Sequence, residues 1–384
     1  TGNFGKIVLH GLKNHKVLVE GFVDLNPTNV GSTISGVPVI KLSDVPKESH
    51  LIFASNRNNI NFLKDLAFKE NIRSVDNCDF LFKDYNFSEL YTSWSMQKCR
   101  DEINRFLFLT ELKESQMNVT SASDDLSIRS LDIVLTEKCS LKCVDCSNLM
   151  QYYQKPENTN HESLKVNLRK FLDNVNHVDE LRLIGGEPFM YKRIYEIVEM
   201  ILKYKNFKAA VIYTNGTIIP KPNFLDLCTD PRVEFFISNY GAELSKKANA
   251  LEEKLRSYKI KYTNEIVTDW QNCGIIGKVD RTEDEHFSVY SNCCVKDTLT
   301  LLHGKIFGCP YAAHIHNLKA CPNFEGDYFN ISEIQPKKIK LCISKLVNGE
   351  RYFGACTFCN GRDYTVGSVP AALQTKKPLD FLKF

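Results

Sequence analysis

The sequence lacks the features that mark a membrane protein or a nucleic-acid-binding protein. No apolar run approaches the roughly 18 residues that a membrane-spanning helix needs, so we expect no membrane span. The 49 basic and 46 acidic side chains leave a formal net charge of only +3. That charge is too small to favour nucleic acid or an anionic membrane as a partner. No basic start followed by a short apolar stretch is visible, and we expect a cytoplasmic protein.

Cysteine is the abundant residue type. The 384 residues suffice for two to three ordinary domains, and a composition of 43% hydrophobic and 25% charged residues is typical of a globular protein. The 14 cysteines are high for such a protein, and the chain is too long to be a small domain held by disulfides. Their clustering favours thiolate ligands in a reducing compartment.

Residues 1–85 alternate between helix and strand, which predicts a parallel sheet. Helices are expected near 1–12 and 59–69, and strands near 17–24, 37–40 and 51–54. Gly2 and Gly5 fit the end of a glycine-rich phosphate loop. Asp24 is expected at a strand end, where an acidic residue can accept hydrogen bonds from ribose hydroxyls.

The stretch from Gly21 to Val39, with GFVDLNP and GVPV, resembles the small Rossmann-like domains of sugar-modifying enzymes. The resemblance predicts a nucleotide-sugar-binding domain over 1–85. The alternative is a degenerate domain that serves only for packing. Residues 86–128 are expected to form a helical connector that ends in a small polar linker.

A second strand–helix alternation occupies residues 129–290. Strands are expected at 131–135, 180–184, 209–213, 233–237 and 259–262, with helices at 161–175, 191–205 and 243–257. This pattern predicts an α/β fold with a parallel barrel, open or closed, whose chemistry lies at the carboxyl ends of the strands.

Three cysteines follow the first of these strands directly. Cys139, Cys143 and Cys146 form a C-x3-C-x2-C pattern. Three thiolates in one loop can bind three irons of a [4Fe–4S] cube and leave the fourth iron open. The alternative is a zinc site with a distant fourth ligand.

With this cysteine pattern, residues 129–360 resemble the radical SAM superfamily. The resemblance implies a partial (β/α) barrel and a [4Fe–4S] cluster whose open iron binds S-adenosylmethionine. It also implies a 5′-deoxyadenosyl radical that abstracts hydrogen from the substrate, a reactivity that the cofactor supplies and the protein positions.

Three further segments resemble motifs of that superfamily, in the same order. Gly185-Gly186-Glu187-Pro188 resembles its GGEP element, Thr214-Asn215-Gly216 its TNG turn, and Ser238-Asn239 a strand end that contacts the cofactor. The resemblance therefore implies S-adenosylmethionine contacts from Gly185, Gly186, Glu187, Pro188, Asn215, Ser238 and Asn239. One position departs from the pattern, because Asp145 stands where an aromatic residue is usual. Tyr152 or Tyr153 is a candidate replacement.

A second group of cysteines lies in residues 291–384. Cys294 and Cys309 flank a predicted hairpin that turns at His303-Gly304, and a C-x2-C pair, Cys356 and Cys359, follows. Such a set can make a four-thiolate site. It resembles the twitch-type, SPASM-like auxiliary domain, which implies one auxiliary [4Fe–4S] cluster. Zinc is the alternative, and Cys293 is a rival ligand to Cys294.

The functional hypothesis is a radical SAM enzyme that acts on a carbohydrate-type, nucleotide-activated substrate, as in polysaccharide biosynthesis. The outcome is oxidation or epimerisation, and an electron donor such as flavodoxin or ferredoxin is the expected partner. Two alternatives are a peptide-modifying radical SAM enzyme and a non-catalytic metal-binding module.

Several other residues of the C-terminal part are candidates for roles in the reaction. Cys321 and Cys342 are candidate hydrogen donors, and Arg362 is a candidate phosphate partner. His314 and His316 alternate as on a strand that faces the substrate. The remaining cysteines, Cys273 among them, are expected to be small buried hydrophobic residues.

Overall fold

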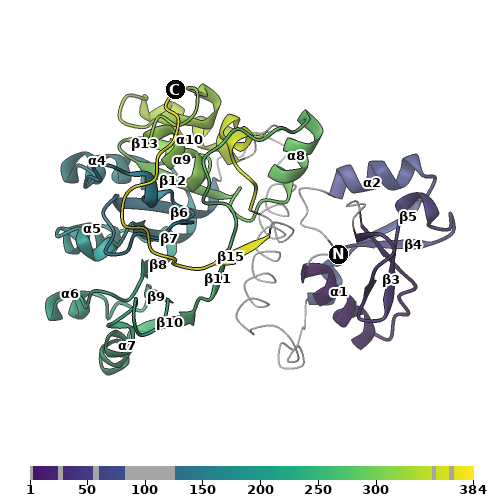
Figure 1. The fold of residues 1–384 in the computed structure, drawn as a ribbon, viewed down its shortest axis with the longest axis horizontal. Coiled ribbons are helices and arrows are strands. Elements are labelled where there is room, and N and C mark those ends of the chain that lie inside the picture. Colours follow the sequence, from purple (N-terminus) through teal and green to yellow (C-terminus); the bar gives the residue numbers. More distant parts are fainter. Residues whose placement is uncertain (1–2, 25–28, 55–59, 83–125, 348–351, 363–366) are drawn as a thin grey trace. The chain divides into compact units, whose positions relative to one another are not determined.

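The computed structural model describes residues 3–24, 29–54, 60–82, 126–347, 352–362 and 367–384. The chain divides into two compact units, residues 1–123 and 124–384. Figure 1 shows both units, and each is described by itself. Within the described residues, no helix is long and apolar enough to cross a membrane.

The N-terminal unit is a small α/β arrangement. Its elements are α1 (Asn3–Asn14), β1 (Phe22–Val23), β2 (Thr33–Ile34), β3 (Val37–Ile40), β4 (His50–Phe53), α2 (Ile60–Lys69) and β5 (Ser74–Asn77). Strand β3 pairs in parallel with β1 and antiparallel with β2, while β4 and β5 form a parallel pair. A core of Val45, Phe53, Ala67 and Ile72 closes the unit.

Two predictions for this unit differ from the structure. The expected strand over 17–24 is reduced to Phe22–Val23, because Val17 and Leu18 are exposed and pair with no strand among the described residues. Strand β5 was not predicted, since Ser74–Asn77 is mostly polar. The predicted connector over 86–128 lies almost wholly outside the described residues.

The larger unit is built on one sheet of eight strands. Its strands are β6 (Ser127–Thr136), β7 (His177–Gly185), β8 (Phe207–Thr214), β9 (Val233–Asn239), β10 (Lys261–Ile266), β12 (Thr298–Leu302), β13 (Lys305–Phe307) and β14 (Tyr328–Asn330). The order is β10-β9-β8-β7-β6-β12-β13-β14. The strands from β10 to β12 are parallel, as predicted for an open barrel. The predicted mixed α/β fold with a large parallel sheet is confirmed.

Helices accompany this sheet. They are α4 (His161–Leu172), α5 (Ile194–Ile201), α6 (Pro222–Leu227), α7 (Ala248–Ser257), α8 (Glu283–Ser291), α9 (Pro310–Asn317) and α10 (Pro336–Val347). A separate antiparallel pair joins β11 (Asp269–Gln271) to β15 (Ser368–Pro370).

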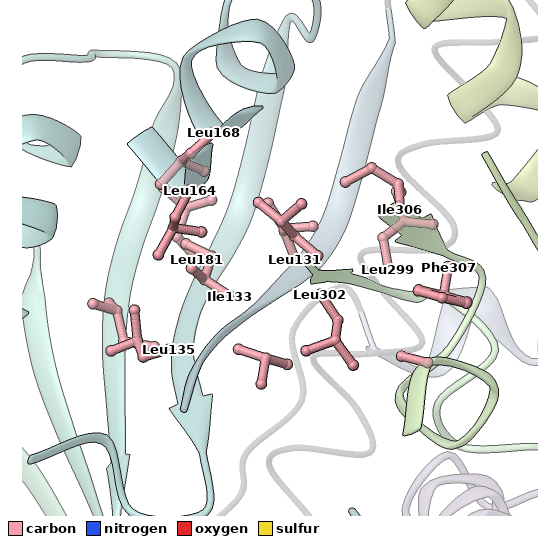
Figure 2. Close-up of a cluster of buried hydrophobic side chains, with 14 of the residues drawn as sticks. Leu131, Ile133, Leu135, Leu164, Leu168, Leu181, Leu299, Leu302, Ile306 and Phe307 are labelled. Atoms are coloured by element: carbon pink, nitrogen blue, oxygen red, sulfur yellow. The ribbon is translucent and has the colours of Figure 1, made fainter. Parts of the chain in front are cut away.

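The two faces of the sheet differ in chemistry. Leu131, Ile133 and Leu135 of β6 belong to the same apolar core as Leu164 and Leu168 of α4 (Figure 2). Because side chains alternate along a strand, the residues between them lie on the opposite face. That face, here called the polar face, carries Ser130, Asp132, Glu180, Arg182, Tyr213, Thr298 and Thr300.

The predicted hairpin is present as β12 and β13, which pair antiparallel. It turns at His303 and Gly304, whose φ angles of 46° and 82° are both left-handed, as a tight hairpin turn requires. Strand β12 also pairs in parallel with β6. The segment that carries the second group of cysteines therefore extends the same sheet.

The prediction that His314 and His316 lie on a strand is wrong. Both lie in helix α9, which begins directly after Cys309. His314 is bonded to the Tyr153 hydroxyl, and His316 pairs with Asp327. Two histidines two positions apart are too short a pattern to identify a strand. Pro310, which occupies the first position of the helix, was the stronger signal.

Candidate active site

Cys139, Cys143 and Cys146 lie in the loop that follows β6. Their side chains pack with Leu141, Leu244 and Ala372 in one small cluster. The chain near Ala372 anchors the loop, because Val144 N donates to Leu373 O at 2.7 Å and Gln374 Nε2 donates to the Cys143 sulfur at 3.2 Å. The structure thus brings together the three thiols that the sequence spacing predicted.

Burial and mutual repulsion disfavour ionisation of these thiols. Burial raises the pKa of Cys143 to about 12, with a further contribution from Cys146. Burial also raises the pKa of Cys139 and of Cys146. The charges of Cys146, Glu187 and Cys143 raise the pKa of Cys139 further. A group that these cysteines bind as thiolates must therefore bring positive charge, as the irons of an iron–sulfur cluster do.

The Gly186 backbone packs tightly on the cysteine loop. A Cβ atom at Gly186 would lie 2.3 Å from the Lys138 carbonyl oxygen and 2.8 Å from the Cys139 Cβ. The Gly186 and Glu187 amides donate to the carbonyls of Thr136 and Lys138. Only glycine allows this approach, which fixes the start of the GGEP element against the loop.

Glu187 is a fully buried carboxylate beside the thiols, with 0% of its surface exposed. It accepts hydrogen bonds from the Thr214 hydroxyl at 2.9 Å, the Asn215 amide at 2.9 Å and the Phe189 amide at 3.2 Å. Burial raises its pKa to about 7 although these bonds lower it. A ligand cation placed beside Glu187 would favour the ionised form.

The other predicted cofactor residues lie at the same end of the sheet. Asn215 Nδ2 lies 3.6 Å from the Cys139 sulfur and donates to the Ser140 hydroxyl at 3.1 Å. Ser238 and Asn239 end β9, where Asn239 donates to Asn264 at 3.1 Å. Gly185 ends β7, and Pro188 begins the short helical turn Pro188–Met190.

Two aromatic residues at the cysteine loop were missed by the sequence analysis. Tyr240 and Trp270 pack against the thiol cluster and meet edge to face at 5.5 Å. Burial and the three thiols raise the pKa of Tyr240. Tyr152 and Tyr153 instead line a cavity of about 550 Å³ together with Glu137 and His303. Tyr240 directly follows Ser238-Asn239, which was the available signal.

The second group of thiols comes from separate elements. Cys309 precedes α9, while Cys356 and Cys359 lie in and just after the short helix Gly354–Phe358. We call two groups electrostatic neighbours when the charge of one affects the pKa of the other. Cys309, Cys356 and Cys359 each have Cys293 as an electrostatic neighbour. The Cys294 thiol lies 3.9 Å from Gln271 Oε1.

Burial is also the main cause of the raised pKa of these thiols. It raises the pKa of Cys359 to about 12 and that of Cys309 and Cys356 as well.

Among the described residues, no group of three or more His, Cys, Asp or Glu side chains converges closely enough to hold a single metal ion. A cubane binds its thiolates through different irons, so its ligands do not meet at one point.

The remaining predicted residues of this unit are spread out. Cys321 is buried, and burial raises its pKa to about 12, whereas Cys342 is partly exposed on α10. Arg362 is an electrostatic neighbour of Cys146, Cys359 and Asp132.

The polar face of the sheet carries a row of buried polar side chains. Asp132 and Thr300 are directly opposite each other on β6 and β12 and are 1% and 0% exposed. Asp132 is 3.3 Å from Arg182, whose guanidinium lies over the Tyr213 ring at 4.5 Å. Asp132 Oδ1 and Thr300 Oγ1 have no hydrogen-bond partner among the described residues. Arg362 is an electrostatic neighbour both of Asp132 in this row and of Cys146 in the cysteine loop.

In the N-terminal unit, Gly2 lies outside the described residues. Gly5 lies inside α1, and a Cβ there would make only ordinary contact with Phe22 at 3.6 Å. Asp24 follows β1 and accepts a hydrogen bond from Asn29 at 2.8 Å. The strand-end placement of Asp24 agrees with the expectation, and the role of Gly5 stays a prediction.

Comparison with known proteins identifies the family of the region that carries the cysteine loop. Residues 133–236 match the radical SAM superfamily. The molybdenum cofactor biosynthesis protein moc-5 of Caenorhabditis elegans is 36% identical over 94 residues, which are 24% of this chain and 15% of that protein. The GTP 3′,8-cyclase of Campylobacter jejuni subsp. doylei is 30% identical over 97 residues, 25% of this chain and 30% of that enzyme.

Solved structures with partial similarity include BtrN in complex with AdoMet and 2-DOIA, at 17% identity and a TM-score of 0.40 over 62% of this chain and 94% of that one. Streptococcus suis SuiB bound to S-adenosylmethionine has 14% identity and a TM-score of 0.37 over 80% and 83% of the two chains. These TM-scores are too low to establish a shared fold, so the assignment rests on the sequence match and the cysteine loop.

Residues 133–236 therefore form a radical SAM domain. This confirms the predicted superfamily, which is one of enzymes. The chain spans less than a third of the length of the curated relatives that it matches.

Proposed function

We propose that this protein is a radical SAM enzyme that removes a hydrogen atom from a carbohydrate-type, nucleotide-activated substrate, with oxidation or epimerisation as the outcome. The observation that carries the proposal is the combination of three neighbouring thiols with a fully buried carboxylate. Cys139, Cys143 and Cys146 are gathered beside Glu187, which is 0% exposed, at the carboxyl end of a parallel sheet.

The residues fit a [4Fe–4S] cluster with S-adenosylmethionine. Cys139, Cys143 and Cys146 would hold three irons, and the tight approach at Gly186 brings Glu187 beside them. Glu187 would accept hydrogen bonds from the methionyl ammonium, supported by Gly185, Pro188, Asn215, Ser238 and Asn239. When bound, the two groups supply a 5′-deoxyadenosyl radical. Tyr240 and Trp270 would take the place of the aromatic residue that Asp145 replaces.

The polar face supports a hydroxyl-rich small molecule as the substrate. Thr300 presents a buried hydroxyl oxygen that has no hydrogen-bond partner among the described residues, which suits a hydroxyl group of the substrate. Arg362, whose buried Nε has no hydrogen-bond partner among the described residues, adds positive charge for an anionic group such as a phosphate. One relative is named for the nucleotide GTP, as a GTP 3′,8-cyclase, which is in keeping with a nucleotide-bearing substrate.

Cys293, Cys309, Cys356 and Cys359 would hold an auxiliary [4Fe–4S] cluster. The charge of Cys293 raises the pKa of each of the other three thiols, which supports Cys293 as the fourth member of this set. Zinc is the alternative occupant, since four thiolates also suit a tetrahedral ion, but the described side chains do not converge closely enough to hold a single ion. An external low-potential donor such as flavodoxin or ferredoxin would supply electrons.

The decisive experiment is anaerobic incubation of the reduced holoenzyme with S-adenosylmethionine and a panel of nucleotide sugars. Formation of 5′-deoxyadenosine that depends on one of these sugars supports the proposal. Formation that depends only on a peptide substrate would replace it with the peptide-modifying alternative. A protein that contains zinc and cleaves no cofactor would favour the non-catalytic module.

The N-terminal unit would bind the nucleotide through Asp24, with Gly2 and Gly5 near the phosphates. Asp24→Ala should weaken nucleotide-sugar binding by about 1.5–3 kcal/mol, the usual range for hydrogen bonds to a charged group. Asp44→Ala is the matched control, because Asp44 is a surface carboxylate of the same unit that bonds Ser43 at 3.0 Å. If calorimetry gives both variants the same affinity for the nucleotide sugar, the N-terminal unit has a structural role only.

A further inference from the structure

The segment Gln271–Gly274 lies between the two groups of thiols. On one side, a Cβ at Gly274 would come within 2.5 Å of the Asp145 carbonyl group, next to Cys146. On the other side, Asn360 donates to the Asn272 carbonyl at 3.2 Å, next to Cys359. These contacts hold Cys273, in the middle of the segment, close to both groups.

Cys273 differs from an ordinary buried cysteine. It is only 2% exposed, yet it belongs to none of the hydrophobic clusters of the described residues. Cys228, at 0% exposure, is packed in the main core. The electrostatic neighbours of Cys273 are Cys146, Cys359 and Arg362. Cys273 therefore lies among polar and ligand-forming groups.

Three residues that belong to this segment or interact with it carry a buried polar atom without a hydrogen-bond partner among the described residues. Gln151 is 3% exposed and donates from Nε2 to the Gly274 carbonyl at 2.7 Å, while its buried Oε1 has no partner. Asn272 Oδ1 and Arg362 Nε are also buried without a partner. A buried polar atom without a partner destabilises the fold. A polar ligand beside Cys273 would offset this destabilisation.

We propose that Cys273 faces the bound substrate and returns a hydrogen atom to it, so that the reaction is an epimerisation. This inference rests on the proposed function. The S–H bond of Cys273 breaks and a C–H bond forms at the substrate carbon that lost its hydrogen. The thiyl left on Cys273 then takes one proton from solvent and one electron from the low-potential donor, and the thiol is restored. Gln151, Asn272 and Arg362 position the substrate.

The first test follows isotope incorporation in heavy water. A thiol exchanges its hydrogen with solvent, so the wild-type product should carry a solvent deuterium at the inverted carbon. Cys273→Ser should still form substrate-dependent 5′-deoxyadenosine in the first turnover but give at least about tenfold less inverted product, because a hydroxyl is a poor hydrogen-atom donor. Cys342→Ser, the matched control on α10, should behave as wild type.

Two results would overturn the proposal. One is inverted, deuterated product from Cys273→Ser at the wild-type rate. The other is an oxidised wild-type product without carbon-bound deuterium. Loss of 5′-deoxyadenosine from the wild type with every sugar would instead reject the proposed function, and a different measurement then decides on Cys273.

That second measurement needs no turnover and no variant. The anaerobic holoprotein is treated with iodoacetamide, and each cysteine is followed by peptide mass spectrometry. Cys273 should react at least about tenfold faster than Cys228, since a substrate site beside Cys273 has to admit small molecules, whereas the apolar core around Cys228 does not. A nucleotide sugar should slow the reaction at Cys273 only. Equal inertness of both thiols would show that Cys273 is a packing residue and refute the inference.

Discussion

The two groups of thiols are built in opposite ways. Cys139, Cys143 and Cys146 come from one loop that a buried strand presents and that the Gly186 backbone holds in place. Cys293, Cys309, Cys356 and Cys359 come from separate segments around α8, α9 and a short helix. The first group depends on local chain geometry, whereas the second depends on the packing of the whole C-terminal part.

The largest expected effect separates the two groups by function. Replacing Cys139, Cys143 and Cys146 together by Ala should abolish cleavage of S-adenosylmethionine and leave about four irons per chain, because the auxiliary cubane keeps its own thiolates. Iron analysis and detection of 5′-deoxyadenosine check this. Cleavage at the wild-type rate would show that the catalytic loop is misassigned.

The next test sharpens the assignment within the second group. Cys293→Ser should lose about four of the irons, while Cys294→Ser should keep them all, because Cys293 is an electrostatic neighbour of each of the other three thiols, whereas the Cys294 thiol lies beside Gln271. The two variants serve as controls for each other. The reverse result, read from iron content and the visible spectrum, would restore Cys294 as the ligand.

Glycine substitutions should distinguish a backbone constraint from a side-chain constraint. Gly186→Ala meets the Lys138 carbonyl oxygen at 2.3 Å and should lower the free energy of unfolding by about 3 kcal/mol. Gly308→Ala meets the Phe353 ring at 1.9 Å, and Phe353→Leu should recover most of that loss. Denaturant unfolding of the single and double variants measures both. Failure of Phe353→Leu to rescue would place the constraint on the backbone there too.

The smallest effect concerns the link between the two groups. His314 on α9 is bonded to Tyr153, which follows the cysteine loop, and burial lowers the pKa of His314 to about 4. The unfolded chain therefore binds the proton more tightly. His314 should contribute stability above about pH 6.5 and lose it as the pH falls towards about 4.

Between about pH 7.5 and pH 5 this amounts to about 2 kcal/mol. Comparison of wild type with His314→Gln by denaturant unfolding at both pH values isolates the contribution. An equal pH dependence of the two proteins would mean that the fold does not lower the pKa of His314.

The contrast also explains what the sequence predicted and what it did not. The loop with Cys139, Cys143 and Cys146 was predictable because its ligands are near neighbours in the chain. The choice between Cys293 and Cys294 was not, since adjacent positions differ only in the direction of their side chains. Cys273 was interpreted as a packing residue, because its neighbours are brought to it by tertiary contacts.

The fold shows the same division. The strands of the radical SAM domain were predicted from long apolar runs, and β6 to β9 agree closely with them. Short elements with mixed composition were not predicted, as β5 and α9 show. Tyr240 and Trp270 reach the cysteine loop only through the arrangement of β9 and β11.

The pairing of β12 with β6 has a consequence for how such proteins can be recombined. A chain cut after about residue 290 would leave β6 without its neighbour and expose a row of unpaired amides and carbonyls along a hydrophobic strand. Open edges of that kind invite aggregation. The C-terminal segment therefore cannot be removed without exposing the sheet. An exchange of domains between relatives would have to transfer β6 and β12 together.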